Sequence, residues 1–485
     1  MQDRLNALLA LARRRDLLVL SDRYPPDAIG GAEISLHLCL SRADLSQRAL
    51  VTVFSNKIQA PEIYWQDGVP VLRLPDADPW PIHAGKAGRH TKWARAGKAS
   101  QTLYEGLAAT RFLTTGGPIH QAADRAMALW LEFQARPRGG VAKDFSLGAN
   151  WARRRAIRSL CRAMQPRTIL LDNYRSILLA PDIRRTLPSA DLVGVVRDNR
   201  FTCARHDQAQ SINGTPCTSC SFACAEQDAK GWQSFHRRHL ELSAQRRRSA
   251  LACVDRAVVT SAFLEKGIRD LGLDLQIDRI PNPGGRLDEV ADFMRGVAEW
   301  PGEHLLIIGM LNENKGQLKF LEHAADWLKT NPNRIIHLAG RGDRIAGQIR
   351  RLATRTGLES QIKLHGYLDR RALFQLARRC QIVLAPTVWP EPFGRVPLEA
   401  GLARRPIIAF ARGGLCETIR SGTTGFLIEP GDYPALLAKT DDLLANPALC
   451  RQVGAAAHSH VSQRYGLDAV IEALSKTLTS PAQPA

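Results

Sequence analysis

The sequence contains no apolar run of the roughly 18–20 residues that a membrane-spanning helix requires. An apolar patch lies near the N-terminus, but three arginines, Arg13, Arg14 and Arg15, follow it. A secretory signal peptide carries its positive charges before its apolar segment and ends at a small-residue cleavage site, and neither feature is present. We therefore expect a cytoplasmic protein.

Acidic residues are scarce relative to basic ones. The chain has 66 lysines and arginines against 47 aspartates and glutamates, a formal net charge of +19. This charge attracts nucleic acid, anionic lipid or acidic small molecules without selecting among them, and a generally arginine-rich composition explains it equally well. Aromatic and basic residues are not interleaved as in nucleic-acid stacking platforms, so we expect no nucleic-acid partner. A basic nucleic-acid-binding protein stays open as the non-enzymatic alternative.

The most informative stretch is 381–417. Its apolar run 382–385 predicts a buried strand, which three prolines then end: Pro386, Pro390 and Pro392. Because proline cannot extend a strand ladder, the chain must leave the sheet in an irregular loop that carries Glu391. A helix over 396–402 follows, and Pro397 is tolerable only in its first turn.

A second strand and helix start follow directly. The strand over 406–411 ends at Gly413 and Gly414, and a helix begins near Glu417. Two helix N-termini therefore point out of the carboxyl ends of adjacent parallel strands, where unpaired N–H groups and the helix dipole favour a bound anion. We interpret that anion as a phosphate.

The run Glu391-Pro392-Phe393-Gly394, with Glu399 eight positions after Glu391, resembles the E-x7-E signature of retaining glycosyltransferases of family 4, also called glycosyl transferases group 1. Two carboxylates at this spacing are weak evidence alone, since an ordinary loop and a solvated helix face also contain them. The Pro-Phe-Gly between them and the Gly-Gly-x-x-Glu downstream make the resemblance specific.

The resemblance implies an α/β protein with the GT-B fold, two Rossmann-like doubly wound domains facing a cleft. The length of 485 residues also suits two domains. We expect a first, acceptor-side domain over 1–285, with a basic insert at about 80–165 and a cysteine-rich insert at 203–224. A nucleotide-sugar-binding domain over 286–465 follows, and a helix and tail over 466–485 would pack back on the first domain.

The resemblance also assigns roles to residues. Lys315, which opens a helix in the second domain, would contact the donor diphosphate as one catalytic residue, and Glu391 would contact the donor sugar as the other. Glu399 would bind the nucleotide ribose. No catalytic cofactor or metal is implied. The predicted donor-binding residues are Gly30, Gly31, Arg197, Phe393, Gly394, Arg395, Glu399, Gly413 and Gly414.

Two positions depart from the family pattern. Met310 stands where relatives usually have an arginine, and either Arg395 or Arg341 would have to compensate. Arg197 stands where many relatives have histidine, so it can only donate hydrogen bonds and stays charged. Arg197 would contact a phosphate or a sugar carboxylate, or would form a structural pair with Asp198.

The implied reaction moves a sugar from a nucleotide-diphosphate donor to an acceptor hydroxyl with retention of configuration. The acceptor would be a saccharide or a lipid-linked molecule, in surface polysaccharide or glycolipid assembly. A sugar-nucleotide epimerase or a phosphorylase of the same fold is the enzymatic alternative.

Four cysteines have the spacing C-x13-C-x2-C-x3-C: Cys203, Cys217, Cys220 and Cys224. This spacing suits a tetrahedral structural zinc. Unligated thiols in a loop are the main alternative, and an iron–sulfur cluster is a third.

Basic residues recur every third position over 86–98, and four more follow at Arg153, Arg154, Arg155 and Arg158. Together these side chains predict peripheral contact with anionic lipid at the inner face of the cell membrane. A solvated segment is the alternative.

Overall fold

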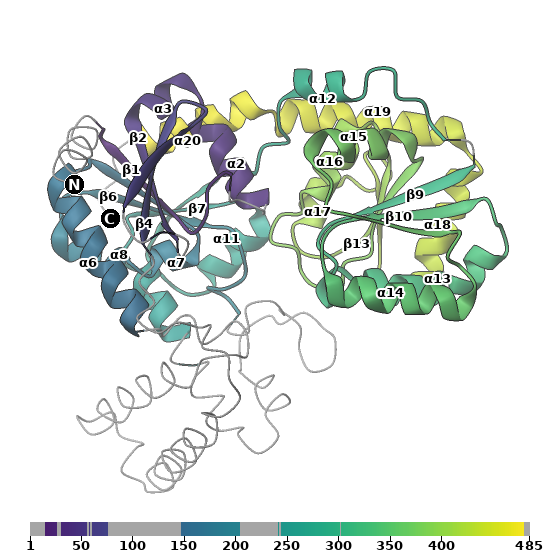
Figure 1. Ribbon diagram of the computed structural model, residues 1–485, viewed down its shortest axis with the longest axis horizontal. Helices are drawn as coiled ribbons and strands as arrows, with labels where there is room; N and C mark the ends of the chain where they lie inside the picture. The colour runs from purple at the N-terminus through teal and green to yellow at the C-terminus, as the bar shows by residue number, and fades with distance from the viewer. Residues whose placement is uncertain are drawn as a thin grey trace, which may run out of the picture.

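The computed structural model describes residues 15–26, 31–55, 58, 61–75, 147–203, 241, 244–300 and 302–479. Two α/β domains lie side by side, each built on one sheet with helices on both faces (Figure 1). The predicted fold class is confirmed. No helix in the described ranges is both long and apolar enough to cross a membrane.

The first sheet has eight strands in the spatial order β3 (Glu62–Gln66), β4 (Val69–Pro75), β2 (Ala49–Ser55), β1 (Leu17–Ser21), β5 (Thr168–Asp172), β6 (Asp191–Val196), β7 (Arg256–Val259) and β8 (Gln276–Arg279). Neighbouring strands are parallel except β3 and β4, which form an antiparallel hairpin at the edge. The hairpin turns at Asp67 and Gly68, both with positive φ.

Helices cover both faces of this sheet, which is why its central strands are mostly apolar and are buried along almost their whole length. In β1, Leu18 and Leu20 pack into one core cluster, whereas Leu17 and Val19 pack into the other. The helices of this domain include α2 (Gly31–Leu40), α3 (Ala43–Arg48), α6 (Leu147–Met164), α7 (Tyr174–Ile177), α8 (Ala180–Thr186) and α11 (Ala262–Arg269).

The second sheet has six parallel strands in the order β11 (Ile362–Gly366), β10 (Arg334–Ala339), β9 (Glu303–Ile308), β12 (Ile382–Ala385), β13 (Ile407–Phe410) and β14 (Phe426–Ile428). Its helical segments are α12 (Leu287–Phe293), the 3₁₀ turn η3 (Glu313–Lys315), α13 (Gln317–Lys329), α14 (Asp343–Thr356), α15 (Arg370–Arg379), α16 (Val396–Leu402), α17 (Leu415–Thr418), α18 (Tyr433–Leu444) and α19 (Pro447–Arg464).

The strand order reverses between β9 and β12. From β9 the chain adds β10 and β11 on one side, then returns to place β12 against β9 and continues outward through β13 and β14. Open parallel sheets bind ligands at such a reversal, outside the carboxyl ends of the strands. The loops that follow β9 and β12 therefore occupy the favoured position for a site.

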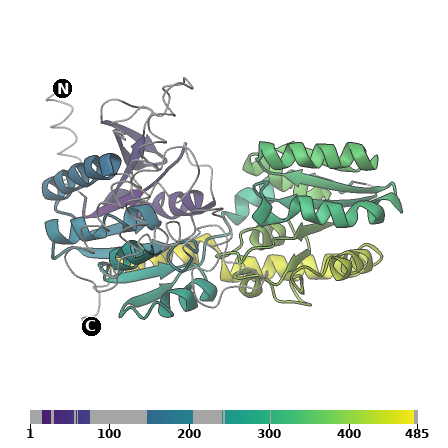
Figure 2. The ribbon, with the colours of Figure 1, turned by 90° about the horizontal axis from the view of Figure 1, so that it is seen from below.

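The chain crosses between the domains twice. The segment after β8 enters the second domain, and α20 (Leu467–Thr479) returns to the first, where Leu467, Val470 and Leu474 join the core cluster of Leu17. Figures 1 and 2 show α19 and α20 in yellow, running from one domain to the other. The two crossing segments are in contact: the Gly284 N–H donates to the Tyr465 carbonyl at 2.8 Å.

Close packing of α19 on the second domain gives a stability prediction. A Cβ at Gly454 would lie 2.2 Å from the Arg404 carbonyl oxygen, a backbone atom that cannot move aside cheaply. Gly454→Ala should lower the free energy of unfolding by about 1–3 kcal/mol. Gly347→Ala in α14 is the matched control, since its Cβ would meet only an arginine tip at 3.8 Å. There alanine should raise stability by up to about 1 kcal/mol. Urea unfolding of both variants checks this, and equal effects would contradict the packing.

Three histidines form a chain across neighbouring strands. His304 Nδ1 and His337 Nε2 are 2.9 Å apart, as are His337 Nδ1 and His365 Nε2, and the Trp300 ring stacks on His337. Burial is the main reason that the pKa of His337 is lowered from 6.5 to about 3, and His365, His304 and Lys363 lower it further by repulsion. The folded domain therefore holds His337 neutral.

This histidine chain predicts acid sensitivity. Because the pKa of His337 lies lower in the folded protein than in the unfolded chain, its contribution to stability is complete above about pH 6.5 and falls as the pH drops toward 3. The limiting slope for one group is about 1.4 kcal/mol per pH unit. Urea unfolding from pH 7.5 to 4.5 should show a shallower slope in His337→Gln than in the natural protein. His323→Gln, at an exposed position, should leave the slope unchanged.

Candidate active site in the second domain

Lys315 and Glu391 meet at the point where the strand order reverses. Lys315 ends η3 in the loop after β9, and Glu391 lies in the loop after β12. The Lys315 ammonium donates to Glu391 Oε1 in a partly buried ion pair. The Asn312 side chain accepts from the Lys315 N–H at 3.0 Å and so fixes the start of the turn. Gly316 follows with φ +69°, where a Cβ would lie 2.1 Å from the Pro386 carbonyl oxygen.

Glu391 is held from several directions. Glu391 is only 7 % exposed, and its Oε1 also accepts from the Thr387 hydroxyl at 3.2 Å. Its backbone carbonyl accepts from the Gly414 N–H at 2.7 Å. Gly413 makes the close approach possible, since a Cβ there would lie 2.3 Å from the Glu391 carbonyl oxygen. The loop therefore presents the carboxylate in one direction.

A small pocket surrounds this ion pair. It is lined by Ile307, Ile308, Lys315, Gln317, Ala385, Pro386, Thr387, Glu391, Gly394, Arg395, Val396 and Leu415. Gln317 is fully buried, and its Oε1 has no hydrogen-bond partner among the described residues. Two cationic side chains, one amide, one hydroxyl and one carboxylate thus line this pocket beside apolar residues, the composition of a small-molecule site.

Arg395 and Glu399 lie at the start of α16, one turn apart. Arg395 donates to the Ser35 hydroxyl of α2 and to the Pro283 carbonyl at 3.5 Å, and its Nε is 3.9 Å from Glu399 Oε1. Burial raises the pKa of Glu399, while the charges of Arg395, Arg370 and Lys315 act to lower it. Burial lowers the pKa of Arg395. Arg395 thus lines the pocket and also bridges to the first domain.

The remaining predicted donor-binding residues of this domain support the loop. Gly394 lines the pocket with φ +84°, and Gly414 packs against the Phe393 backbone, where a Cβ would be 2.6 Å from Phe393 Cα. The Phe393 ring lies in the core against Tyr465, so only its backbone faces the site's loop. The two helices whose N-termini were predicted to bind phosphate are short, at seven and four residues.

Arg197 does not pair with Asp198, which instead pairs with Arg200. The Arg197 guanidinium instead donates to the Asp172 carboxylate at 2.6 Å and to the Asn282 side-chain oxygen at 2.8 Å. Asp172 ends β5 beside β6, so the partner is adjacent in the sheet although 25 positions away in the chain. Arg197 thus forms a structural ion pair, as one alternative predicted, but with Asp172 and not with Asp198.

Three other predictions meet the structure only in part. Gly31 begins α2, whereas Gly30 lies outside the described residues. Met310 is 65 % exposed after β9, and the Arg341 guanidinium lies 4.3 Å from the Tyr367 ring centroid. Of the two arginines proposed to compensate for Met310, Arg395 is therefore the one that lines the pocket around Lys315.

Most of the cysteine and basic inserts lie outside the described residues. Cys203 is buried, but its three proposed zinc-ligating partners are not described, and the zinc site stays a prediction. No group of three or more potential metal ligands occurs in the part of the chain that is described. Of the proposed membrane-contacting residues, Arg154 pairs with Asp182 at 3.0 Å and Arg153 stacks on Phe54. Arg153 and Arg154 are therefore engaged within the domain.

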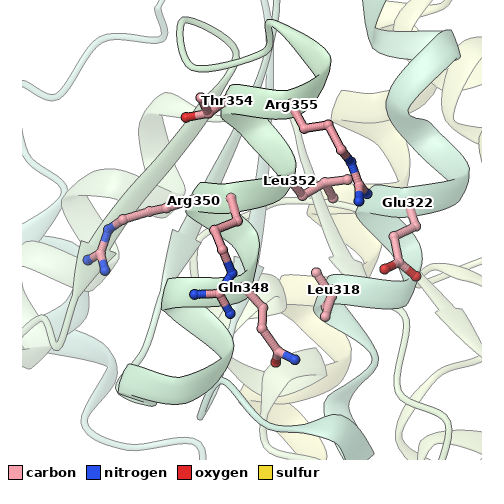
Figure 3. A pocket seen from close by; sticks show the side chains of 8 residues that line it. Leu318, Glu322, Gln348, Arg350, Leu352, Thr354 and Arg355 are labelled. Carbon is pink, nitrogen blue, oxygen red and sulfur yellow. The ribbon is translucent and has the colours of Figure 1, made fainter.

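A wider depression lies on the outer side of the second domain, between α13 and α14 (Figure 3). It is lined by Leu318, Glu322, Gln348, Arg350, Arg351, Leu352, Thr354 and Arg355. Its lining comes from α13 and α14 and includes none of the residues in the loops that follow β9 and β12, so we place the site at Lys315 and Glu391 instead.

Thr387 was missed from the sequence. It follows Pro386 in the loop and binds the Glu391 carboxylate, yet a threonine beside a proline carries no signal of its own. Asp172 was also missed as a partner of Arg197, and its position at the end of an apolar strand was the available clue.

The buried ion pair gives a testable coupling. Lys315→Met leaves the Glu391 carboxylate without its cation, so its cost in unfolding free energy should exceed its cost in a Glu391→Gln background by about 1 kcal/mol or more. Urea unfolding of the two single variants and the double variant measures this difference. The exposed pair Lys329 and Asp326 is the control and should show no measurable coupling. Additive effects at Lys315 and Glu391 would contradict the ion pair.

Known proteins are similar to this chain in sequence and in fold. Residues 299–460 match the family model described as Glycosyl transferases group 1. Glycogen synthase from Mycobacterium tuberculosis is 27% identical over 209 residues, covering 41% of this chain and 50% of the relative. D-inositol 3-phosphate glycosyltransferase from Streptomyces griseus is 31% identical over 135 residues, 27% of this chain and 28% of the relative. The chain thus spans half or less of the length of these curated relatives.

Solved structures resemble the whole chain. HepE from Anabaena in complex with UDP-glucose has a TM-score of 0.62 at 16% identity, covering 96% of this chain and 99% of that one. Sucrose-phosphate synthase from Thermosynechococcus elongatus has a TM-score of 0.64 at 18% identity, covering 96% and 98%. At this identity the likeness shows the fold. Residues 299–460 therefore match the Glycosyl transferases group 1 family model, within a chain that has the GT-B fold.

Proposed function

We propose that the protein is a retaining glycosyltransferase that moves a sugar from a nucleotide-diphosphate donor to an acceptor hydroxyl. One observation carries this proposal. Lys315 and Glu391 form an ion pair at the carboxyl edge of the second sheet, between the two strands where the strand order reverses. A family relationship in the same domain supports it.

Charge development explains why these residues suit the reaction. Cleavage of the donor bond places positive charge on the anomeric carbon and negative charge on the departing diphosphate. A fixed cation aimed at the diphosphate stabilises it without needing to reorganise. Lys315 has three N–H donors and gives one to Glu391, so the others are available to phosphate oxygens.

The carboxylates would recognise the rest of the donor. In this proposal Glu391 accepts hydrogen bonds from the sugar hydroxyls, and Glu399 accepts them from the nucleotide ribose. Neither acts as a covalent nucleophile, and the departing phosphate takes the proton of the acceptor hydroxyl. Gly394, Gly413 and Gly414 let the loops that would hold the donor pack closely against each other. HepE was solved with UDP-glucose, which makes UDP-sugars the first donors to test.

The acceptor would bind on the first domain, opposite the donor. Arg197 and Asp172 lie at the carboxyl ends of β6 and β5, with the Ser21 hydroxyl of β1 donating to Asp172 at 3.1 Å. A saccharide or lipid-linked acceptor, used in polysaccharide or glycolipid assembly at the inner face of the cell membrane, fits the basic charge of the chain. Within the described residues, Arg155 is the exposed arginine of the proposed lipid contact.

The direct test is release of nucleoside diphosphate from a panel of UDP-, GDP- and ADP-sugars. At least one donor should be consumed, and Glu391→Ala should raise the barrier by about 2 kcal/mol or more, roughly a thirtyfold loss of kcat/KM. Glu472→Gln, on an exposed helix position, is the matched control and should behave like the natural protein. Near-normal turnover in Glu391→Ala would contradict the assignment, and an isomerised donor would indicate an epimerase.

A further inference from the structure

The loop that carries Glu391 is buried but belongs to no strand or helix. Pro390, Glu391 and Pro392 are all buried, and prolines supply no N–H for a backbone ladder. Their carbonyl oxygens still need hydrogen-bond donors, because an unsatisfied buried carbonyl is costly. The source of those donors therefore determines the shape of the loop.

Two of the donors come from the first domain. The Asn199 side-chain amide donates to the Pro390 carbonyl at 3.0 Å, and the Ser261 hydroxyl donates to the Pro392 carbonyl. Asn199 is 1 % exposed and Ser261 is fully buried. The carbonyl between them, that of Glu391, accepts from Gly414 of its own domain. Three successive carbonyls are thus fixed, two of them by the opposite domain.

The first domain also donates to the second domain at the start of α11. Ser261 caps α11 by accepting from the Leu264 N–H at 3.2 Å. Glu417 of the second domain accepts from the Ala262 N–H at 2.6 Å, beside that cap. The start of α11 is therefore stabilised by both domains, so the helix cannot keep all of its partners if the domains separate.

We propose that Asn199 and Ser261 are positioning residues that hold the Glu391 loop in its working shape. The first domain thereby sets the orientation of a donor-side carboxylate in the second. When the domains separate, the Pro390 and Pro392 carbonyls lose their donors, the loop relaxes, and Glu391 no longer faces Lys315. This inference rests on the proposed function for its catalytic consequence, but the structural link itself is measurable without turnover.

The first test follows Lys315 by chemical labelling. The rate at which an acetylating reagent modifies Lys315 is measured by mass spectrometry relative to exposed Lys329. Ser261→Ala and Asn199→Leu should raise that rate at least threefold, because Glu391 no longer holds the ammonium. Ser261→Thr keeps the hydroxyl and should match the natural protein. Asn446→Ala removes the cap of α19 elsewhere in the chain and should also match it.

The Glu391→Gln background distinguishes loss of the Lys315 and Glu391 ion pair from a general destabilisation of the fold as the cause of faster labelling. There Ser261→Ala should leave the labelling rate of Lys315 unchanged, because the ion pair is already absent. An equal rise in both backgrounds, or a natural rate in folded Ser261→Ala, would overturn the inference.

Turnover provides the second test. With a donor that the natural protein consumes, Ser261→Ala should lower kcat tenfold or more while KM for the donor changes less than threefold, and Ser261→Thr should restore kcat. An unchanged kcat in Ser261→Ala would overturn the inference. If the natural protein consumes no sugar nucleotide, the proposed function fails, and the labelling of Lys315 still decides whether the first domain holds the loop.

Discussion

The pairing of a buried carboxylate with one lysine is the interaction on which the site depends. Glu391 is largely withdrawn from water, and a charge in that position is costly unless it is paired and hydrogen-bonded. Lys315 and Thr387 supply both partners. They can do so because β9 and β12 are neighbours in space, although 76 positions separate the two charged residues. The fold and the site are therefore consequences of the same strand order.

The proline-rich loop that carries Glu391 also connects the two domains through hydrogen bonds. Its backbone is satisfied by Gly414 on one side and by side chains of the first domain on the other. Arg395 strengthens the link, since it lines the pocket and reaches the Ser35 hydroxyl of α2. An enzyme that closes on two substrates benefits from such coupling, because the catalytic constellation is complete only when both domains are in place.

Local patterns predicted what is locally encoded. The strand over 382–385 and the helix over 396–402 lie where the apolar run and Pro397 indicated. The edge hairpin was missed although Asp67-Gly68 is a turn signal. The partner of Arg197 and the domain-crossing bonds of Asn199 and Ser261 could not be found, since each joins residues that only the tertiary fold brings together. Phe393 was assigned to the donor, but its ring is needed in the core.

The central claim is that Lys315 is held by Glu391 so that it can meet a diphosphate. A crystal structure of the protein with a bound nucleoside diphosphate tests this most directly. The account predicts a phosphate oxygen within about 3 Å of the Lys315 ammonium, with the Glu391 carboxylate still beside it. A diphosphate bound elsewhere, with the Lys315 and Glu391 pair undisturbed and out of reach, would contradict it.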